Sequence, residues 1–330
     1  MKREQLPPHK TATFVMRRWH AMYVSVNKAA CTSLKWLVAE LQDEDPARFH
    51  RSLSREVTPT MTIHRRHLWR KTPMAKRLPE EELAAISPDD GWFVFAVVRH
   101  PTARLFSAWQ SKLLLREPWF VEQFSDEEWF PRQPAGGEDI VSEFQRFVRI
   151  VAEDPEQRIM RNRHFARQDW LLAVDRMPYS RVYKTSEIGE LLTDFEAHLR
   201  ERGYTGGPLK LARANETPLK PIAALFTPEV LDASRALYAD DFERFGYDDA
   251  LPGGLDPAGR YDDDVLAEIG RLVERQERIN DLALRAQQIQ VRARAAVAAA
   301  KAPPPKPQPS RVRRLAWRAK HRLVAARPRS

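Results

Sequence analysis

The sequence contains a single cysteine, Cys31, among its 330 residues. One cysteine excludes a framework of intramolecular disulfides and is typical of a reducing compartment. The sequence also lacks any run of about 18 apolar residues, the length that a membrane-spanning helix needs. Residues 1–10 contain no apolar signal core. We therefore expect a globular, cytoplasmic protein.

Acidic residues are missing from the last part of the chain. Residues 301–330 hold ten Lys and Arg and no Asp or Glu, and the whole chain carries a net charge of +9. Residues 1–300 therefore carry −1, so the basic character belongs to a tail. This distribution makes nucleic acid an unlikely partner of the folded body.

The Walker A pattern GxxxxGK[ST] is also absent, yet residues 22–41 indicate a strand, a polar loop and a helix. Tyr23–Val26 predicts a short buried strand, and Leu34–Leu41 has the spacing of one helix face. The loop between them, Asn27–Ser33, holds the cation Lys28, two hydroxyl groups and small residues. Such a loop directs backbone N–H groups and the positive end of the helix at one point, which predicts a phosphate site.

A second unit of the same kind lies at residues 92–115. Phe93–Val98 is a continuous apolar run, as a strand buried on both faces requires. Arg99 follows this strand, and Pro101 suits the first turn of the next helix. Ser107 lies about two turns into that helix. Two such units predict a ligand that carries phosphate at two positions.

Both units resemble motifs of one enzyme family. NKAACTSLK (27–35) is similar to the 5′-phosphosulfate loop of the carbohydrate sulfotransferases, roughly PKxGCTSxK, and VVRHPTARLFSAW (97–109) resembles their 3′-phosphate element. Further along the chain, weaker similarities follow in the same order as in the family; the segments are HFARQDWL, VYKTSEI, NETP and LYADDFERFGY. The resemblance therefore spans about residues 22–247. Asn27 replaces the usual proline and Ala30 the usual glycine. Alanine adopts a positive φ less readily than glycine does.

The resemblance implies a sulfotransferase that uses 3′-phosphoadenosine 5′-phosphosulfate (PAPS) as sulfuryl donor and requires no metal ion. Arg99 and Ser107 would bind the 3′-phosphate. Arg104 could join them, although we expect it to pair with an internal carboxylate instead. Lys28 is the expected catalytic group, because a cation near the bridging oxygen stabilises the leaving phosphate. The acceptor implied is a hydroxyl group of a carbohydrate or a glycolipid. The loop that would bind the 5′-phosphate consists of Lys28, Ala29, Ala30, Cys31, Thr32 and Ser33.

A general base must take the proton of that hydroxyl group, and histidine suits neutral pH. Residues 60–67, TMTIHRRH, predict a strand that reaches His64, and His64 is our leading candidate for the base. His67 and His164 are the alternatives. An insertion rich in aromatic residues, 117–138, is expected to shape the acceptor pocket.

The fold expected for residues 14–250 is α/β, a P-loop-like three-layer α/β/α domain with a short parallel sheet. Residues 1–13 are expected to form a flexible arm before it, and residues 251–264 a linker after it. Both of these flanking segments are polar and rich in residues that favour turns.

A helical, basic extension is expected after the linker. Residues 265–300 predict one long helix whose apolar positions recur every three or four residues, which suits self-association as a coiled coil or a helix folded back on the body. Residues 301–330 combine a proline-rich spacer with a basic tail. Within that tail, residues 311–327 have the spacing of an amphipathic helix, which suggests peripheral binding at the anionic inner face of a membrane.

Two other functions stay open at this level. LLAVD (171–175) is similar to a Walker B strand that holds Mg²⁺, as in a P-loop kinase or another phosphotransferase. Without a Walker A loop we interpret it as the end of a helix. The other alternative is a non-catalytic nucleotide-binding adaptor whose basic tail recruits a membrane or nucleic acid.

Overall fold

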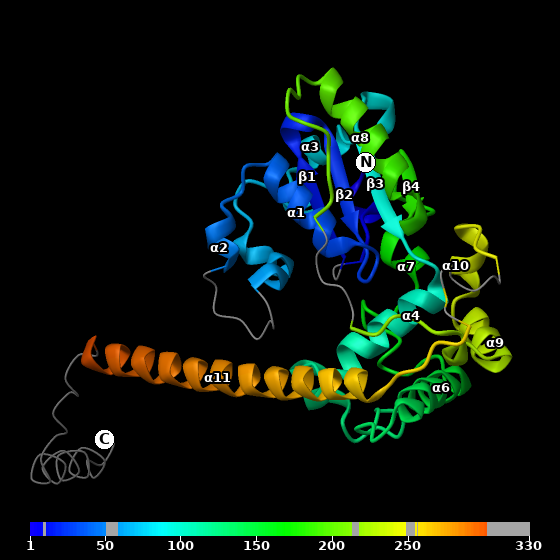
Figure 1. The fold of residues 1–330 in the computed structure, drawn as a ribbon. Helices are drawn as coiled ribbons and strands as arrows, with labels where there is room; N and C mark the ends of the chain where they lie inside the picture. The colour runs from blue at the N-terminus through cyan, green and yellow to red at the C-terminus, as the bar shows by residue number, and fades with distance from the viewer. Residues whose placement is uncertain (9–10, 51–58, 213–217, 249–254, 256, 302–330) are drawn as a thin grey trace, which may run out of the picture. The chain divides into compact units, whose positions relative to one another are not determined.

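The computed structural model describes the chain except for residues 9–10, 51–58, 213–217, 249–254, 256 and 302–330 (Figure 1). The chain divides into two compact units, Met1–Ala283 and Leu284–Ser330. The first unit contains the sheet and both phosphate motifs.

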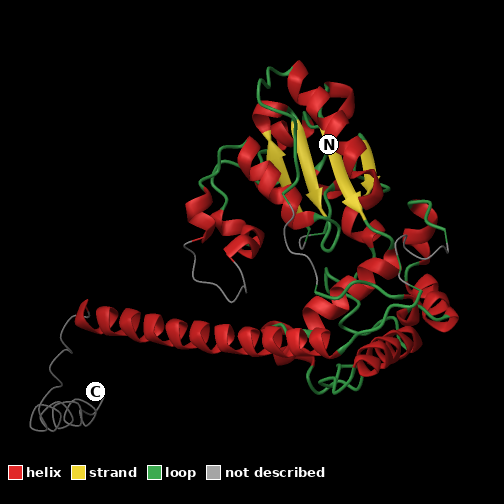
Figure 2. Ribbon diagram, viewed as in Figure 1, coloured by secondary structure: helices red, strands yellow, loops and turns green. Residues whose placement is uncertain are grey.

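A four-stranded sheet forms the centre of the first unit, with its strands in the order β1-β2-β3-β4 (Figure 2). Strands β2 (Ala21–Ser25), β3 (Phe93–Val98) and β4 (Arg181–Lys184) are parallel, as predicted. β1 (Ala12–Met16) pairs with β2 in the antiparallel direction. Residues 17–20 are too few for a crossover, so the chain turns back on itself there. The sheet is therefore mixed, with one antiparallel edge strand.

The carboxyl ends of the parallel strands bring the two motifs to one edge of the sheet. Val24 in β2 lies opposite Ala96 in β3, so the loop that follows β2 and the residue that follows β3, Arg99, leave the same edge. Ligands bind at this edge in open α/β sheets. The predicted α/β architecture is confirmed in this respect.

Helices pack around the sheet in one apolar cluster. Helix α1 (Cys31–Leu41) contributes Leu34, Leu37 and Val38, and α8 (Ile188–Glu201) contributes Leu191, Phe195 and Leu199. Shorter helices complete this part of the unit; they are α2 (Pro46–His50), α3 (Glu80–Ala84) and α7 (Gln168–Leu172).

The strand predicted at residues 60–67 is wrong. Pro59–His64 forms a 3₁₀ helix, η3, that packs against α1. The Thr62 hydroxyl group donates to the carbonyl oxygen of Phe49 (2.7 Å), and Ile63 is fully buried. Burial of β-branched residues produced a strand-like pattern, although the sheet has no place for this segment. Other short helices are η1 (Arg3–Gln5), η2 (Arg17–Trp19), η4 (Arg66–Leu68), η5 (Ala75–Arg77), η6 (Pro88–Asp90), η8 (Thr185–Glu187) and η9 (Ala223–Leu225).

A second apolar cluster surrounds the helix that carries Ser107. This helix, α4 (Pro101–Trp109), continues into a π-helical turn, η7 (Gln110–Leu114). The predicted aromatic insertion adds Phe120, Phe124, Trp129 and Phe130 to this cluster. The other helices of the cluster are α5 (Pro118–Phe124), α6 (Gly137–Glu153), α9 (Pro228–Leu237) and α10 (Ala239–Arg244).

The amino-terminal residues are docked, in contrast to the flexible arm that we expected at 1–13. The Met1 amino group donates to the carbonyl oxygens of Leu83, Ala84 and Ile86, at 2.9 to 3.1 Å. Arg3 donates to Glu80 and to two backbone carbonyl groups. Residues 1–3 are therefore part of the folded unit.

The long helix predicted at residues 265–300 is present as α11 (Asp263–Lys301). Its first turns pack on the second apolar cluster through Ile269, Val273 and Gln276, which are at most 6% exposed. This part of the helix therefore folds back on the body, one of the two arrangements that the spacing allowed. Among the described residues no helix has the length and apolar character that a bilayer crossing requires. Residues 311–327 lie outside the described residues.

Candidate active site

The loop between β2 and α1 has the shape of an anion site. Lys28 (φ 70°) and Ala30 (φ 53°) both adopt left-handed backbone conformations, and Ala30 is the N-cap of α1. Alanine therefore takes the turn for which the family pattern uses glycine, at a cost of about 1–2 kcal/mol. No side chain caps the first turn of α1. The N–H groups of Cys31, Thr32 and Ser33 are thus left for a ligand.

Lys28 joins the two motifs. Its ammonium group donates to the hydroxyl group of Ser111 (2.8 Å), which lies one turn beyond Ser107. Burial, together with the nearby cations Lys112 and Arg99, lowers the pKa of Lys28 to about 7. An anion at this point would reverse that effect, because it would stabilise the charged ammonium group.

His64 lies against the same loop, although it comes from a 3₁₀ helix rather than a strand. Its Nε2 is 3.0 Å from the Thr32 hydroxyl oxygen, and its Nδ1 is 2.8 Å from the Lys35 Nζ. An ammonium group can only donate, so Nδ1 accepts from Lys35 and Nε2–H donates to Thr32. Both ring nitrogens of His64 are therefore engaged with α1.

His164 lies on the other side of the loop. Its backbone N–H donates to Asn162 Oδ1 (3.0 Å), and its Nδ1 lies 2.9 Å from the same oxygen, so Nδ1 carries the proton. Its Nε2 then accepts from the Asn27 amide (3.0 Å). Asn27 is the residue that replaces the proline of the family pattern. The ring is thus oriented by one amide, while its basic nitrogen faces the loop.

Both histidines are kept neutral by their surroundings. Burial lowers the pKa of His64 and of His164 well below the usual value, and the cations Lys112, Arg163 and Lys28 lower both further. Beside burial, the main causes of both shifts are therefore neighbouring basic groups. The site is therefore rich in positive charge and complementary to a ligand with several negative charges.

Arg99 and Ser107 occupy the places that the second motif predicts. The backbone N–H and carbonyl groups of Arg99 are both held by the side-chain amide of Gln168, at 2.9 and 2.8 Å. Burial lowers the pKa of Arg99, and within the described part of the chain its guanidinium group has no ion pair. Ser107 is 3% exposed in α4. Cys31 is a buried free thiol at the start of α1.

Arg104 is bound differently from our expectation. Instead of pairing with a carboxylate, its buried guanidinium group donates to the carbonyl oxygens of Asn27, Ala166 and Arg163, at 3.0, 2.8 and 3.1 Å. It thereby ties the loop to the segment that carries His164. Its role is structural.

Several residues of the site were not found from the sequence. These residues are Ser111, Lys35, Lys112, Asn162 and Arg163. Two of them carried a signal, because Lys35 is the final lysine of NKAACTSLK and Ser111 lies four residues after Ser107 on the same helix face. His67 is exposed in η4.

The Walker B resemblance of residues 171–175 is not supported. Helix α7 ends at Leu172, Ala173 adopts a left-handed conformation, and Asp175 forms an exposed ion pair with Arg244. Among the described residues no group of three His, Cys, Asp or Glu side chains could hold a metal ion. LLAVD is the end of a helix, as we interpreted it.

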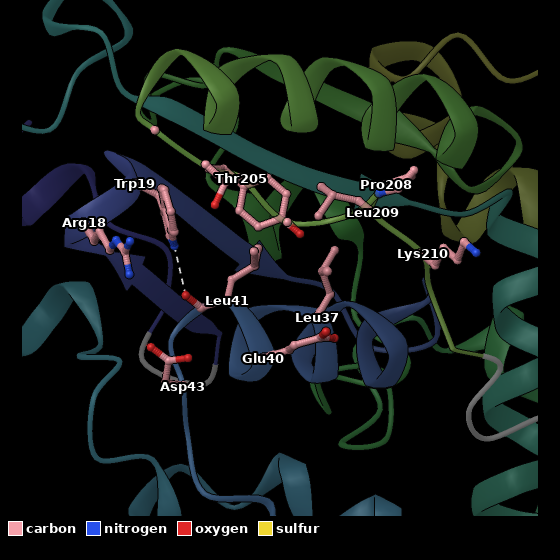
Figure 3. A pocket seen from close by; sticks show the side chains of 13 residues that line it. Arg18, Trp19, Leu37, Glu40, Leu41, Asp43, Thr205, Pro208, Leu209 and Lys210 are labelled. Carbon is pink, nitrogen blue, oxygen red and sulfur yellow. Dashed lines mark hydrogen bonds between the residues drawn. The ribbon is translucent and has the colours of Figure 1, made fainter.

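A cavity of about 420 Å³ lies at the opposite end of α1 (Figure 3). Leu37, Glu40 and Leu41 from the last turn of α1 line it, together with Trp19 and Tyr204. The rise of α1 puts this cavity about 15 Å from the loop. It is therefore separate from the anion site.

Comparison with known proteins supports the assignment of the two motifs. Residues 11–248 match the protein family described as the sulfotransferase family. No curated protein matches the chain, and no solved structure does either. The match covers both motifs, the sheet and the segment that carries His164.

Proposed function

Because the chain belongs to the sulfotransferase family, we propose that it moves a sulfuryl group from PAPS to a hydroxyl group of a carbohydrate or a glycolipid. The observation that carries the proposal is the contact between Lys28 and Ser111, which joins the 5′-phosphosulfate loop to the helical turn that continues the 3′-phosphate element, in a buried, cationic site. The acceptor class rests on the resemblance of these motifs to those of carbohydrate sulfotransferases. The single free cysteine suits a cytoplasmic enzyme.

The residues present fit this donor. The first turn of α1 offers three backbone N–H groups and the hydroxyl groups of Thr32 and Ser33 to the 5′-phosphate. Arg99 offers a planar guanidinium group to the 3′-phosphate, and Ser107 lies two turns along the following helix. The donor supplies a sulfuryl group attached to phosphate through an anhydride oxygen.

In the proposed reaction the acceptor oxygen forms a bond to sulfur while the bond from sulfur to the phosphate oxygen breaks. Lys28 would donate to that bridging oxygen and stabilise the charge that develops on it. Its buried position strengthens this interaction, because fewer water molecules screen the charge. No group of this chain changes its oxidation state, and the proton of the acceptor passes to a base.

The geometry favours His164 over His64 as that base. The basic nitrogen of His64 faces an ammonium group, whereas that of His164 faces only the Asn27 amide, a weaker partner that a hydroxyl group can replace. Asn162 orients the His164 ring through Nδ1, the arrangement that general bases share. His64 would then orient Thr32 in the phosphate loop.

Calorimetry with nucleotides tests the donor assignment. The full chain should bind adenosine 3′,5′-bisphosphate at least about tenfold more tightly than AMP, because Arg99 makes one additional charge-assisted contact. Turnover with PAPS and a panel of sugars and glycolipids should proceed in the presence of EDTA. Tighter binding of ATP than of the bisphosphate, together with Mg²⁺-dependent ATP turnover, would contradict the proposal and favour a phosphotransferase.

A further inference from the structure

The carboxyl-terminal unit concentrates the positive charge of the protein. Residues 284–330 hold thirteen Lys and Arg and no Asp or Glu. Since the net charge of the chain is +9, residues 1–283 together carry −4. The change of charge thus coincides with the boundary between the two compact units, Met1–Ala283 and Leu284–Ser330.

Two unburied apolar side chains accompany this charge on α11. Ile289 is 66% exposed and Val297 is 54% exposed, and every residue from 287 to 300 is exposed. At 3.6 residues per turn, both lie on an arc about 100° wide, which we call the Ile289 face. Its members are Ala286, Ile289, Ala293, Ala296, Val297 and Ala300.

Arginine residues border the Ile289 face. Viewed down the helix axis, Arg285 and Arg292 lie within about 50° of one edge of this face. Arg294 lies beyond the other edge. A second apolar stripe, which includes Val291 (59% exposed), lies on the opposite side, and Gln287 and Gln288 interrupt it. Within residues 284–300 the Ile289 face is therefore the one uninterrupted apolar arc, and arginines flank it on both sides.

We propose that the helix segment 284–301 docks the protein on an anionic lipid surface through the Ile289 face. Ile289 and Val297 would enter the boundary between headgroups and acyl chains, while the arginines extend to the phosphate groups. Further along the chain, the tail adds attraction through its charge. This inference is independent of the proposed catalytic function.

Two other occupants fit less well. A second copy of the chain would bring thirteen like charges against thirteen, which opposes association through this segment. Nucleic acid would account for the cations, but phosphate contacts do not explain why an exposed isoleucine and valine lie on the face that the arginines border.

Vesicle flotation with the full chain tests the proposal. The protein should float with vesicles of phosphatidylcholine and phosphatidylglycerol at low salt and should not float with phosphatidylcholine alone. The double variant Ile289→Gln/Val297→Gln should bind at least about tenfold more weakly, because two apolar side chains no longer enter the bilayer. Val291→Gln is the matched control, since it makes the same change on the opposite side of the same helix, and it should bind like wild type. Circular dichroism verifies that all variants remain helical.

Arginine variants test the role of charge in vesicle binding, and assays with DNA and by sedimentation test the other two occupants. Arg285→Gln/Arg292→Gln/Arg294→Gln should weaken vesicle binding by roughly a hundredfold at low salt. Equal flotation of the Ile289→Gln/Val297→Gln and Val291→Gln variants would overturn the proposal, as would the absence of flotation by the wild type. Retention on duplex DNA at salt concentrations that release the chain from anionic vesicles would assign the surface to nucleic acid. A dimer in sedimentation that Ile289→Gln/Val297→Gln abolishes, without vesicle binding, would assign it to a second copy.

Discussion

The ammonium group of Lys28 lies 2.8 Å from the hydroxyl group of Ser111, although 83 residues separate them in the sequence. Strands β2 and β3 are parallel neighbours, so the segments after them meet at one edge of the sheet. The Lys28 ammonium group therefore connects the loop after β2 to the helical segment after β3.

Removal of the Lys28 charge should abolish most of the turnover. Lys28→Met keeps much of the side-chain volume but has no donor for the leaving oxygen, so kcat should fall by about 10²–10³. Lys112→Met is the control, because Lys112 acts on the same site as a neighbouring charge, with its Nζ 5.9 Å from the centre of the Phe120 ring. It should lower kcat by less than about tenfold. Steady-state assays with PAPS measure both, and similar losses in the two variants would contradict a specific role for Lys28.

Binding of adenosine 3′,5′-bisphosphate should depend on pH through Lys28. Burial lowers the pKa of Lys28 to about 7 in the free protein, and a bound anion would raise it. Above pH 7 the complex would therefore take up a proton, and affinity should fall by up to about tenfold per pH unit until the pKa of the complex is reached. Calorimetry in buffers of different ionisation enthalpy measures this uptake. Lys28→Met should show none; proton uptake by that variant would assign the titration to another group.

Arg99 should determine the preference for a 3′-phosphate. Arg99→Ala should weaken binding of adenosine 3′,5′-bisphosphate by roughly ten- to a hundredfold, because one charge-assisted contact is lost. AMP lacks that phosphate and serves as the internal control, so its affinity should remain unchanged. If the variant still distinguishes the two nucleotides as the wild type does, the 3′-phosphate lies elsewhere.

Substitution of His164 should lower kcat, whereas substitution of His64 should weaken nucleotide binding. His164→Ala should lower kcat by about 10²–10⁴ with little change in donor affinity, as expected for a general base. His64→Ala should instead weaken nucleotide binding, since His64 orients Thr32. Thr32→Ala should then resemble it. Nucleotide calorimetry and kcat measured on the same variants separate these roles. A His64→Ala enzyme with normal nucleotide affinity and a greatly reduced kcat would restore His64 as the base.

The loop should become more stable when glycine replaces Ala30. Ala30→Gly removes the steric cost of φ 53°, about 1–2 kcal/mol, against an entropic loss of about 0.4–1 kcal/mol in the unfolded chain. The variant should therefore be as stable as wild type or more stable by about 1 kcal/mol. Ala29→Gly is the matched control: Ala29 is fully buried and has no positive φ, so it should lose about 1 kcal/mol. Urea unfolding measures both, and equal effects would contradict a strained Ala30.

The two phosphate motifs could be predicted from the sequence because their information is local. A buried strand, a polar loop and a helix start follow one another at residues 22–41 and again at 92–115, and each pattern depends on neighbours within a few residues. The sequence therefore predicted the elements on which Lys28, Thr32, Arg99 and Ser107 lie. The long helix α11 was found in the same way, from its regular spacing and lack of proline.

The identity of the histidine partners depended on tertiary structure instead. His64 meets Thr32 and Lys35 because η3 packs on α1, and the strand predicted there shared the same apolar positions. Arg104 reaches three carbonyl groups on segments far apart in the sequence. No periodicity encodes such contacts, because they arise from which elements pack together. Local sequence patterns were therefore enough to predict the two strand–loop–helix units, whereas the partners of each histidine ring follow only from which elements pack together.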